Sequence, residues 1–446
     1  MIIFYINNMQ KEIYVWGAGH YGVLTALDLE NNGIQTKGFI DKNATQIKTR
    51  LGLPVFEPNE VIYDKSQNVK IVIAIQNEKA IKEVIEILLV AGLKKNIDFE
   101  ISPLIVPPLD YFSSIEEEID YYRNMLKKRN DIYLHDEETA KHLANTWNGS
   151  VNKPKNLRFI ENAIPVVLCA NEKYAPYLAA MLQSLLDHSS SQRKYHFIIL
   201  ERNFSVKIKD YLVKQVLKFS HCEIDFIDIA SIFDDIPIAS LNYVSLDGYS
   251  RLFIPYWLDK YSKVIYLDSD MIAKADIAEL YDLDISDFCM GIVSCQITNW
   301  HLKHRHYSFF TSAAFIFLEN WSRYINSGVL VFDTQKFEEE ISYQDLFKFA
   351  IYYSNRYKKR YNDQDVLALL IKDNYFPLPV EWNYSWIAPG GGYREAKLDT
   401  KIIHFICEQK PWTNDPVIEE LPIVIEYRSY AMNVPLYREC QELIQL

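Results

Sequence analysis

The sequence lacks the features of a membrane-spanning or nucleic-acid-binding protein. No apolar run approaches the length of a bilayer span, because the longest candidates, residues 85–93 and 309–318, have only the size of core segments. Basic charge is in deficit, with a formal net charge of −12 and a pI near 5.4, whereas nucleic-acid backbones are held mainly by clustered Lys and Arg. We therefore expect no nucleic-acid partner and no membrane span, with peripheral membrane association left open.

Cysteines at metal-binding or redox spacing are absent as well. Six cysteines occur, and no two form a CxxC pair or part of a zinc-like set. They are Cys169, Cys222, Cys289, Cys295, Cys407 and Cys440. Residues 1–6 carry neither the basic lead nor the full apolar region of a secretory signal. Reduced, mostly buried thiols in a cytoplasmic protein are the simplest interpretation.

The length of 446 residues predicts more than one domain, because it exceeds a single ordinary core. The composition, 49% apolar and 24% charged, is typical of an ordered globular protein. Prolines at 103, 107 and 108 interrupt the first regular pattern. We predict an α/β protein with an N-terminal Rossmann-like domain over residues 1–105, a helical connector over 106–160 and a C-terminal domain over 161–446.

A glycine-rich turn supports the assignment of the first domain. Strand-like residues 12–16 lead into Gly17, Gly19 and Gly22, a GxGxxG arrangement that opens a helix, and the next strand ends at Asp41. Such glycines let a pyrophosphate approach the helix, and the acidic residue can take ribose hydroxyls. The segments GAGHYG and GFIDKN resemble the small Rossmann-like domain that precedes sugar-modifying modules in bacterial sugar O-acyltransferases and polysaccharide enzymes. The resemblance implies nucleotide or nucleotide-sugar binding, and a vestigial or interface-forming role is the alternative.

An apolar run that ends in two carboxylates stands out in the second domain. Residues 264–267 predict a buried strand, and Asp268 and Asp270 follow it with one residue between them. Alternate side chains of an extended chain point to the same side, so both carboxylates can reach one hard divalent cation. Acidic residues in strand-to-loop turns are more often structural. The functional interpretation is a sugar-nucleotide site, because a departing diphosphate needs its charge neutralised.

Further segments carry a specific family resemblance. Strands and helices alternate from residue 164, which predicts a mostly parallel sheet with ligands beyond the carboxyl ends of its strands. Residues 164–437 resemble glycosyltransferase family 8, the retaining GT-A enzymes related to bacterial lipopolysaccharide galactosyltransferases and to glycogenin. The matching segments, in family order, are VVLCANEKYAPYLAAMLQSLL, YSRLFIP, KVIYLDSDMIA, YINSGVLVFD, NDQDVLALL, WNY and HFICEQKPW. A GT-A glycosyltransferase domain with a mostly parallel mixed sheet is what this resemblance implies.

Carried over residue by residue, the resemblance implies a metal site beside a leaving-group site. Asp268, Asp270 and His404 match the metal ligands, with Mn2+ as the implied ion and Mg2+ as the alternative. Lys410 matches the lysine that contacts the diphosphate, where its charge stabilises the leaving group. Arg251 matches the arginine that braces the sugar and phosphate end of the donor.

The resemblance also implies a UDP-sugar pocket. Tyr174 matches the ring that stacks on uracil, and Asn171 stands where the family has a base-reading aspartate. Gln364 matches the amide at the reactive face, but an amide is a poor nucleophile, so we favour same-face substitution over a covalent intermediate. The predicted catalytic residues are Arg251, Asp363, Gln364 and Lys410. The predicted donor-binding residues are Cys169, Asn171, Tyr174, Arg251, Asp268, Ser269, Asp270, Asn326, Ser327, Asp363, Gln364, His404 and Lys410.

Two groups of residues depart from the simple picture. Lys173, Gly248 and Cys407 replace more usual residues of the family's donor pocket, which predicts altered nucleotide affinity or sugar choice. Three histidines between residues 301 and 306 suggest a second metal site, but without accompanying carboxylates a lid or part of the acceptor groove is the favoured interpretation.

The function predicted from the resemblance is a Mn2+-dependent, retaining hexosyltransferase. It would move glucose or galactose from a UDP donor to a glycan or glycoprotein acceptor. Two alternatives place a function in residues 1–105, namely a regulatory or docking module and an NAD-linked sugar-nucleotide oxidoreductase. The short span of residues 1–105 and the absence of a Tyr-x-x-x-Lys motif within them disfavour the oxidoreductase. Formation of a homo-oligomer is left open.

Overall fold

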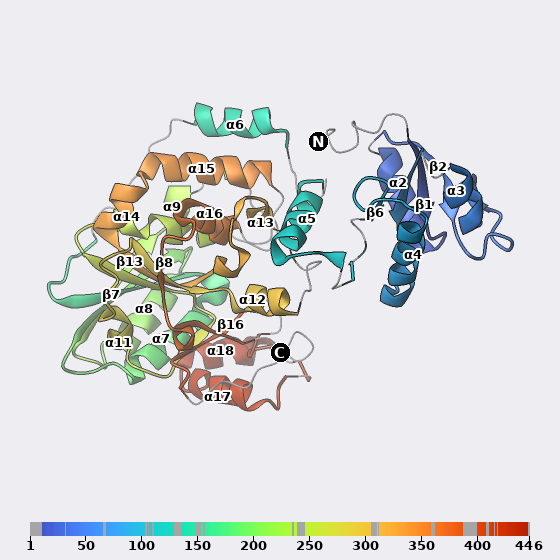
Figure 1. Cartoon of the computed structure of the whole chain (residues 1–446). Coiled ribbons are helices and arrows are strands. Elements are labelled where there is room, and N and C mark those ends of the chain that lie inside the picture. The colour runs from blue at the N-terminus through green and yellow to red at the C-terminus, as the bar shows by residue number, and fades with distance from the viewer. Residues whose placement is uncertain are drawn as a thin grey trace. The chain divides into compact units, whose positions relative to one another are not determined.

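The computed structural model divides into two units, residues 1–129 and 130–446 (Figure 1). The division falls inside the segment predicted as a connector, between helix α5 (Ile115–Lys128) and helix α6 (Glu137–Thr146). The structure describes residues 11–31, 33–65, 68–102, 105, 107–108, 111–128, 135–147, 153–154, 157–233, 236–238, 246–304, 310, 312–357, 362–386, 399–406, 410–413, 415–416 and 418–444.

The first unit is a sheet of six strands with helical crossovers. Before α5 its elements are β1 (Glu12–Trp16), α2 (His20–Asn31), β2 (Thr36–Ile40), β3 (Thr49–Arg50), β4 (Leu53–Phe56), α3 (Pro58–Lys65), β5 (Val69–Ile73), α4 (Glu78–Val90) and β6 (Phe99–Ile101). The strand order is β3-β4-β2-β1-β5-β6, and all neighbours are parallel except β3 with β4. Parallel neighbours need long crossovers, which the helices supply. The predicted α/β class and Rossmann-like pattern of this unit agree with the structure.

Strand β1 divides its side chains between two apolar cores. Tyr14 and Trp16 pack in the core that also holds apolar residues of α3 and α4, whereas Val15 packs in the core that contains residues of α2. Successive strand residues face opposite sides of a sheet, so one short apolar strand serves both layers. At the start of α4, the Asn77 side chain accepts a hydrogen bond from the Ala80 N–H and satisfies an otherwise unpaired amide.

The described part of the second unit contains ten strands. They are β7 (Ala163–Asn171), β8 (Lys194–Arg202), β9 (Cys222–Asp228), β10 (Lys263–Leu267), β11 (Met271–Ala273), β12 (Met290–Ser294), β13 (Ile325–Asp333), β14 (Phe376–Pro377), β15 (Tyr384–Trp386) and β16 (Ile402–Phe405) within the described ranges. Its helices after α6 are η3 (Glu172–Tyr174), α7 (Ala175–Asp187), α8 (Val206–Val216), α9 (Ala230–Phe233), η4 (Leu246–Phe253), α10 (Ile254–Trp257), α11 (Ala278–Tyr281), α12 (Gln296–Lys303), α13 (Ala314–Phe317), η6 (Trp321–Arg323), α14 (Thr334–Glu340), α15 (Tyr343–Arg356), α16 (Asn362–Ile371), η7 (Val380–Asn383), α17 (Pro422–Ala431) and α18 (Pro435–Ile444), where η marks a 3-10 helix.

Seven of these strands form the main sheet, in the order β14-β12-β13-β10-β7-β8-β9. Strands β10, β7, β8 and β9 are parallel, whereas β13 runs antiparallel to both of its neighbours, β10 and β12. The predicted mostly parallel mixed sheet is confirmed. Because β13 runs in the opposite direction, its first residues lie at the edge where β10 ends.

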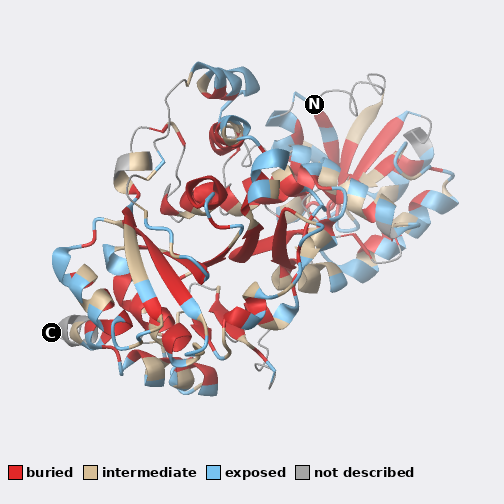
Figure 2. Cartoon of the chain, turned by 90° about the vertical axis from the view of Figure 1, so that its left-hand side faces the viewer, coloured by how far each residue is buried: buried red, intermediate tan, exposed pale blue. Residues whose placement is uncertain are grey.

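Helices cover both faces of the main sheet, with α7 and α8 on one side and α15 and α16 on the other (Figure 1). Strands buried on both faces are continuous apolar runs rather than alternating ones. Strand β10 follows this rule, whereas β13 also buries the polar residues Asn326 and Ser327, and both strands are buried along most of their length. Figure 2 shows that the strands of the molecule are largely buried.

A small second sheet joins the end of β10 to a distant part of the chain. Its order is β11-β16-β15, with β16 antiparallel to β11 and parallel to β15. Strand β11 begins directly after Asp270, so β16 lies beside the two predicted metal-binding carboxylates. Local sequence pattern could not supply this pairing, since residues 271 and 404 are brought together only by the tertiary fold.

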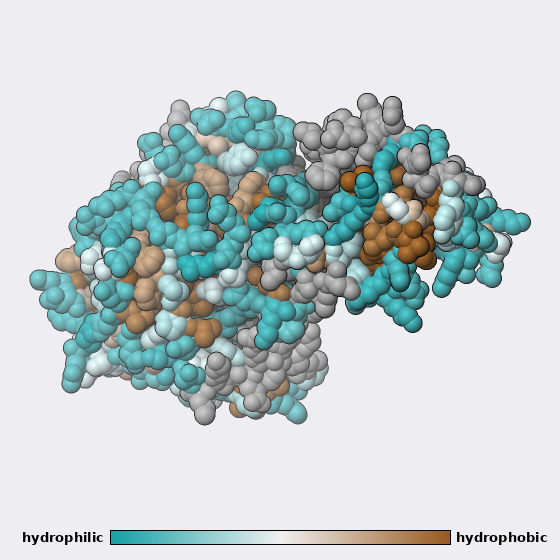
Figure 3. All heavy atoms as spheres, viewed as in Figure 1, coloured by the Kyte–Doolittle hydropathy of each residue, from teal (hydrophilic) through white to brown (hydrophobic). Residues whose placement is uncertain are grey.

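The exposed side chains are predominantly hydrophilic on the face that Figure 3 shows. This agrees with the formal net charge of −12. Among the helices that the structure describes, none combines the length and the apolar character needed to cross a lipid bilayer.

Candidate active site

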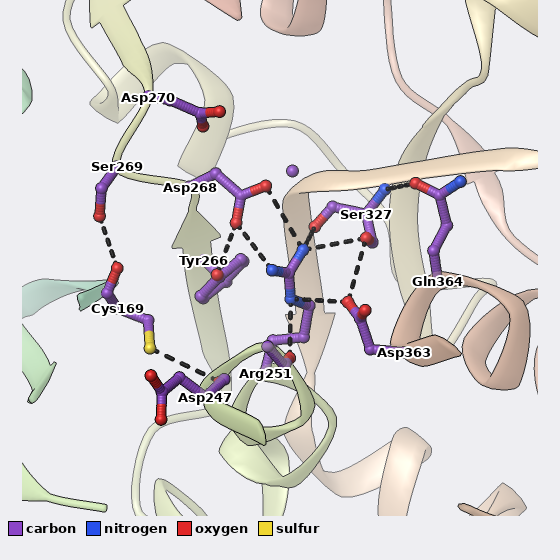
Figure 4. A network of polar contacts seen from close by, with 12 residues as sticks. Cys169, Asp247, Arg251, Tyr266, Asp268, Ser269, Asp270, Ser327, Asp363 and Gln364 are labelled. Carbon is purple, nitrogen blue, oxygen red and sulfur yellow. Dashed lines mark hydrogen bonds and ion pairs between the residues drawn. The ribbon is translucent and has the colours of Figure 1, made fainter. Parts of the chain in front are cut away.

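Two carboxylates project from the turn that follows β10. The Asp268 N–H donates to the Gly328 carbonyl of β13 at 2.9 Å and so fixes the start of this turn. The Ser269 hydroxyl donates to the Cys169 carbonyl of β7 at 2.5 Å. Asp268 and Asp270 therefore lie on one side of the turn, while Ser269 points toward β7 (Figure 4). The alternation expected from an extended chain is retained here.

His404 reaches the same place through the pairing of β16 with β11. Its register partner is Met271, and the Phe405 N–H donates to the Asp270 carbonyl at 3.0 Å. His404 Nε2 lies 3.2 Å from Asp270 Oδ1 and 3.7 Å from Asp268 Oδ2. Ligand atoms of the three residues lie within 4.8 Å of one another. The structure thus brings together the three residues predicted to bind a metal.

These three side chains fit a divalent cation. Two carboxylates and one imidazole form the mixed oxygen and nitrogen donor set that suits Mn2+. The His404 side chain is 5% exposed, whereas those of Asp268 and Asp270 are 20% and 18% exposed. A buried imidazole with part-exposed carboxylates leaves the oxygen side of the site open to a ligand that shares the cation.

Lys410 supplies positive charge at the same carboxylate. Its Nζ lies 2.6 Å from Asp270 Oδ2 and also donates to the Phe405 carbonyl. Burial raises the pKa of Asp270, but the Lys410 ammonium, joined by the His404 ring when that ring is protonated, lowers it more, so the net pKa lies well below its ordinary value. The Asp270 carboxylate is therefore ionised in the folded protein near neutral pH.

An aromatic stack anchors the segment that carries Lys410. The Trp412 ring stacks on Tyr177 of α7 with a centroid distance of 3.9 Å and an interplanar angle of 12°. Tyr174 meets both rings edge-on, at 5.6 Å from Tyr177 and 6.1 Å from Trp412. The Tyr174 residue is 40% exposed, so this ring can accept a further stacking partner.

Arg251 connects two acidic residues from different elements. Its guanidinium contacts Asp268 Oδ1 at 3.0 Å and Asp363 Oδ2 at 3.1 Å, and it donates to the Ser327 carbonyl at 3.0 Å (Figure 4). It also lies over the Tyr266 ring, 4.8 Å from the centroid. Burial lowers the pKa of Arg251, but Asp268 and the other acidic neighbours raise it more, so the cation persists. Arg251 therefore links Asp268, on the predicted metal side of the site, to Asp363 and Ser327 on the predicted sugar side.

The Gln364 amide is engaged at both ends. Its Oε1 accepts the Ser327 N–H at 3.1 Å, and its Nε2 donates to the Tyr324 hydroxyl at 2.9 Å. The Tyr324 hydroxyl in turn donates to buried Asp365 at 2.6 Å. These bonds set the orientation of the amide and define which atom faces β13.

The turn after β7 uses Asn171 as a helix cap. Its Oδ1 accepts the Tyr174 N–H at 3.2 Å and opens η3. A carbonyl oxygen has two lone pairs, so one acceptor position is left for a ligand. Nearby, burial raises the pKa of the Cys169 thiol to about 12, which keeps it protonated. Cys169 contacts the turn through its carbonyl rather than through a thiolate.

The glycine-rich turn of the first unit is stabilised by Asp41. Asp41 Oδ2 accepts the Ala18 N–H and Oδ1 accepts the Asn43 N–H, each at 2.9 Å. Gly22 is required by packing, because a Cβ there would lie 1.7 Å from the Gly17 carbonyl oxygen. The structure therefore brings Asp41 to the turn, as the motif predicts. Ligand binding by Gly17, Gly19, Gly22 and Asp41 stays a prediction.

Asn383 and Gly328 contact the site although sequence reasoning gave them no role. Asn383 is fully buried, and its Oδ1 lies 3.0 Å from His404 Nδ1. At Gly328 a Cβ would lie 2.3 Å from His404 Cε1. The only available signal was membership in the segments WNY and YINSGVLVFD, which carried no stated function.

The histidines of residues 301–306 form no second metal group in the described part of the chain, where the three residues at β10 and β16 are the only such group. His304 Nδ1 lies 2.8 Å from the Trp300 carbonyl. His306 and Cys407 lie outside the described residues. The lid or acceptor role of this segment stays a prediction.

The sequence also matches a known protein family and several curated proteins. The model of a family described as Glycosyl transferase family 8 matches residues 165–415, more than half of the chain. General stress protein A of Bacillus subtilis (strain 168) is 23% identical over 279 residues, which cover 60% of this chain and 93% of that protein. A lipopolysaccharide 1,2-glucosyltransferase of Escherichia coli (strain K12) is 26% identical over 195 residues, which cover 41% of this chain and 54% of that enzyme.

Among solved structures, the fold resembles that of the bifunctional glycosyltransferase WbbM in its apo form. The TM-score is 0.55 at 22% identity, and the match covers 66% of this chain and 54% of WbbM. This likeness concerns the fold. The matched region spans only about half of WbbM and of the Escherichia coli enzyme.

Proposed function

Because the chain belongs to glycosyltransferase family 8 and is a glycosyltransferase, we propose that it transfers glucose or galactose from a UDP donor to a glycan or glycoprotein acceptor with retention of configuration. The observation that supports this proposal is the convergence of Asp268, Asp270 and His404 within 4.8 Å, with Lys410 against one of the carboxylates. Such a site neutralises the diphosphate of a sugar nucleotide.

Asp268, Asp270 and His404 would hold Mn2+, or alternatively Mg2+. When bound, the cation supplies positive charge to the diphosphate oxygens and lowers the energy of the departing UDP. Asp270 is already ionised, since its pKa lies below the ordinary range, and needs no deprotonation before it binds a cation.

Lys410 would bind the departing diphosphate. The ammonium lies 2.6 Å from Asp270 Oδ2, which places it beside the proposed cation site. A point charge on a flexible stem can move toward a phosphate oxygen as negative charge develops there. The stack of Trp412 on Tyr177 holds the base of this segment.

Arg251, Asn326, Ser327 and Asp363 would orient the transferred sugar. Asp363 is buried and contacts Arg251 Nε at 3.1 Å, so its carboxylate is fixed in direction. A fixed carboxylate accepts hydrogen bonds from sugar hydroxyls and selects the hexose by their positions. Tyr174 would stack on uracil, and Asn171 would read it, with further contacts from Cys169 and Ser269.

We favour same-face substitution. The Gln364 amide is a poor nucleophile, and both of its polar atoms take part in hydrogen bonds with Ser327 and Tyr324. In the proposed reaction, the acceptor hydroxyl forms a bond to the anomeric carbon as the bond to the UDP oxygen breaks on the same face. A phosphate oxygen of the departing UDP takes the hydroxyl proton.

For the first unit we propose a regulatory or docking role. Both Asp41 oxygens accept backbone N–H groups of their own unit, whereas a dinucleotide-binding acidic residue directs them to ribose hydroxyls. The NAD-linked alternative predicts that the full chain binds NAD. Isothermal titration calorimetry of the protein with NAD tests this alternative, and the absence of NAD binding would reject it.

The decisive experiment incubates the full chain with Mn2+ and a panel of UDP sugars and measures UDP release by mass spectrometry. We expect UDP-glucose or UDP-galactose to give the highest rate, and chelation of the metal to stop it. Equal, metal-independent rates for all sugars would reject both the donor and the metal assignments.

A further inference from the structure

Asn383 is a fully buried amide that faces a proposed metal ligand and that no step of the proposed reaction uses. We infer that a chain of hydrogen bonds from the Gly328 backbone through Asn326 and Asn383 fixes the tautomer of His404, so that the Nε2 lone pair faces Asp268 and Asp270. Asn383 is then a positioning residue. This inference rests on the proposed cation site.

The donor and acceptor of each hydrogen bond in this series follow from the first bond. The Gly328 N–H is a backbone donor, so Asn326 Oδ1, at 3.0 Å, must be an acceptor. Asn383 Nδ2 lies 2.8 Å from the same oxygen and must therefore be its second donor. With Nδ2 so placed, the Asn383 atom that faces His404 is the carbonyl oxygen.

The last bond sets the proton on the ring. Asn383 Oδ1 lies 3.0 Å from His404 Nδ1 and can only accept, so Nδ1 carries the hydrogen. In the neutral ring, Nε2 then has its lone pair free, and Nε2 is the atom 3.2 Å from Asp270 Oδ1. A metal-binding imidazole requires this arrangement, in which its other nitrogen donates to a protein acceptor.

Without these hydrogen bonds, the two carboxylates would favour the Nε2–H tautomer of His404. A hydrogen on Nε2 would point at Asp270 and Asp268, which attract it, and no cation could then bind to that nitrogen. Two features oppose that outcome. Asn383 offers the hydrogen a buried acceptor at Nδ1, and Arg251 and Lys410 already balance the charge of the two carboxylates.

Gly328 fixes the position of the ring as well as its tautomer. A Cβ at this residue would lie 2.3 Å from His404 Cε1 and 2.6 Å from Nδ1, so the ring packs directly on the β13 backbone. The Gly328 carbonyl accepts the Asp268 N–H at 2.9 Å. One glycine of an antiparallel strand thus contacts both an imidazole ligand and the backbone of a carboxylate ligand.

Nitrogen NMR of the full chain tests the tautomer without metal or donor. The protein is labelled with 15N-histidine, and the His404 signals are assigned by their loss in His404→Gln. At a pH where the His404 ring is neutral, we expect the Nδ1–H tautomer in the wild type and in Asn383→Asp, which keeps an acceptor, and its loss in Asn383→Leu. An Nε2–H tautomer in the wild type, or in Asn383→Asp, would overturn the inference, as would an unchanged ring in Asn383→Leu.

Mn2+ affinity, measured by electron paramagnetic resonance, gives the second readout. Asn383→Leu removes the acceptor for the His404 Nδ1 hydrogen, and this loss should weaken Mn2+ binding by about 10-fold to 100-fold. The matched control is Asn355→Ala, which removes a buried amide that bonds to the Pro237 and Ile351 carbonyls. It should lower the thermal midpoint and leave Mn2+ affinity unchanged.

The two readouts separate this inference from the proposed function. A wild type that binds no Mn2+ but shows the Nδ1–H tautomer would reject the metal assignment and retain the hydrogen-bond chain. A wild type that binds Mn2+ with an affinity equal to that of Asn383→Leu would reject the positioning role and retain the metal site.

Discussion

The two units of this protein each place an acidic residue at the end of a parallel strand, but the two carboxyl groups have different surroundings. In the first unit, both Asp41 oxygens accept backbone N–H groups of neighbouring turns. In the second, Asp268 and Asp270 are contacted by side chains of Arg251, Lys410 and His404. A strand-end carboxylate therefore has either backbone partners or charged side-chain partners, and we propose that only the second kind binds a cation. The sequence motif alone does not distinguish these two kinds of carboxylate.

The largest effect expected from this contrast is that of Asp270→Asn. The substitution keeps the shape of the side chain but removes the charge that a cation needs, so transfer should fall by about 10³-fold or more. UDP release measures the rate, and circular dichroism verifies the fold. Asp282→Asn, at an exposed ion pair with Arg193, serves as the control and should retain the wild-type rate. Near-normal turnover of Asp270→Asn would place Asp270 in the structural class with Asp41.

Lys410→Ala should give the next largest effect. Loss of a charge that stabilises the departing diphosphate should lower kcat by about 10²-fold to 10³-fold. Steady-state kinetics with the preferred UDP sugar provide the measurement. The control is Lys207→Ala, which removes an exposed lysine paired with Glu439. If kcat is unchanged in Lys410→Ala, this lysine only neutralises Asp270 and has no part in leaving-group departure.

Gly22→Ala tests whether the first unit contributes to transfer. A Cβ placed 1.7 Å from the Gly17 carbonyl oxygen cannot be accommodated without backbone movement, so this unit should lose about 3 kcal/mol of stability or more. Differential scanning calorimetry would show a lower first transition, whereas the UDP release rate below that transition should stay the same. Gly19→Ala is the matched control, because nothing lies within 4 Å of its Cβ position. A parallel loss of transfer would mean that the two units are coupled.

Asp41→Asn should have the smallest effect. The amide keeps one acceptor oxygen for Ala18 or Asn43 and loses the other bond, at a cost of about 1 kcal/mol in the free energy of unfolding. Urea unfolding measures this difference, and the transfer rate should not change. A loss of affinity for a nucleotide in this variant would instead show that Asp41 binds a ligand, and would contradict the structural role described here.

Local patterns predicted much of the fold. The apolar run before Asp268 predicted strand β10, and the glycine-rich turn predicted the start of α2. The direction of β13 could not be predicted, because a short apolar run such as its residues 329–332 has the same pattern in parallel and antiparallel strands. That direction is what carries Asn326, Ser327 and Gly328 to the end of β10.

The candidate site was only partly readable from the sequence. Asp268 and Asp270 were visible through their spacing, whereas His404 and Lys410 were assigned only through family resemblance. Asn383 was missed, since a single buried amide has no local signature and acquires its role from the ring beside it. The assignment of Asn326 to the donor stays a prediction, and the structure adds that its Oδ1 accepts from Gly328 and Asn383 inside the protein.

By itself, the sequence determined the alternation of strands and helices, the α/β class, the position of two carboxylates after a strand and, through resemblance, the family. These depend on neighbouring residues and on period, which a linear chain preserves. Only the tertiary structure decided that β16 pairs with β11, so that an imidazole 134 residues beyond Asp270 lies 3.2 Å from its carboxylate. Hydrogen-bond direction and charge balance depend on such distant partners, because electrostatic interactions act across space rather than along the chain.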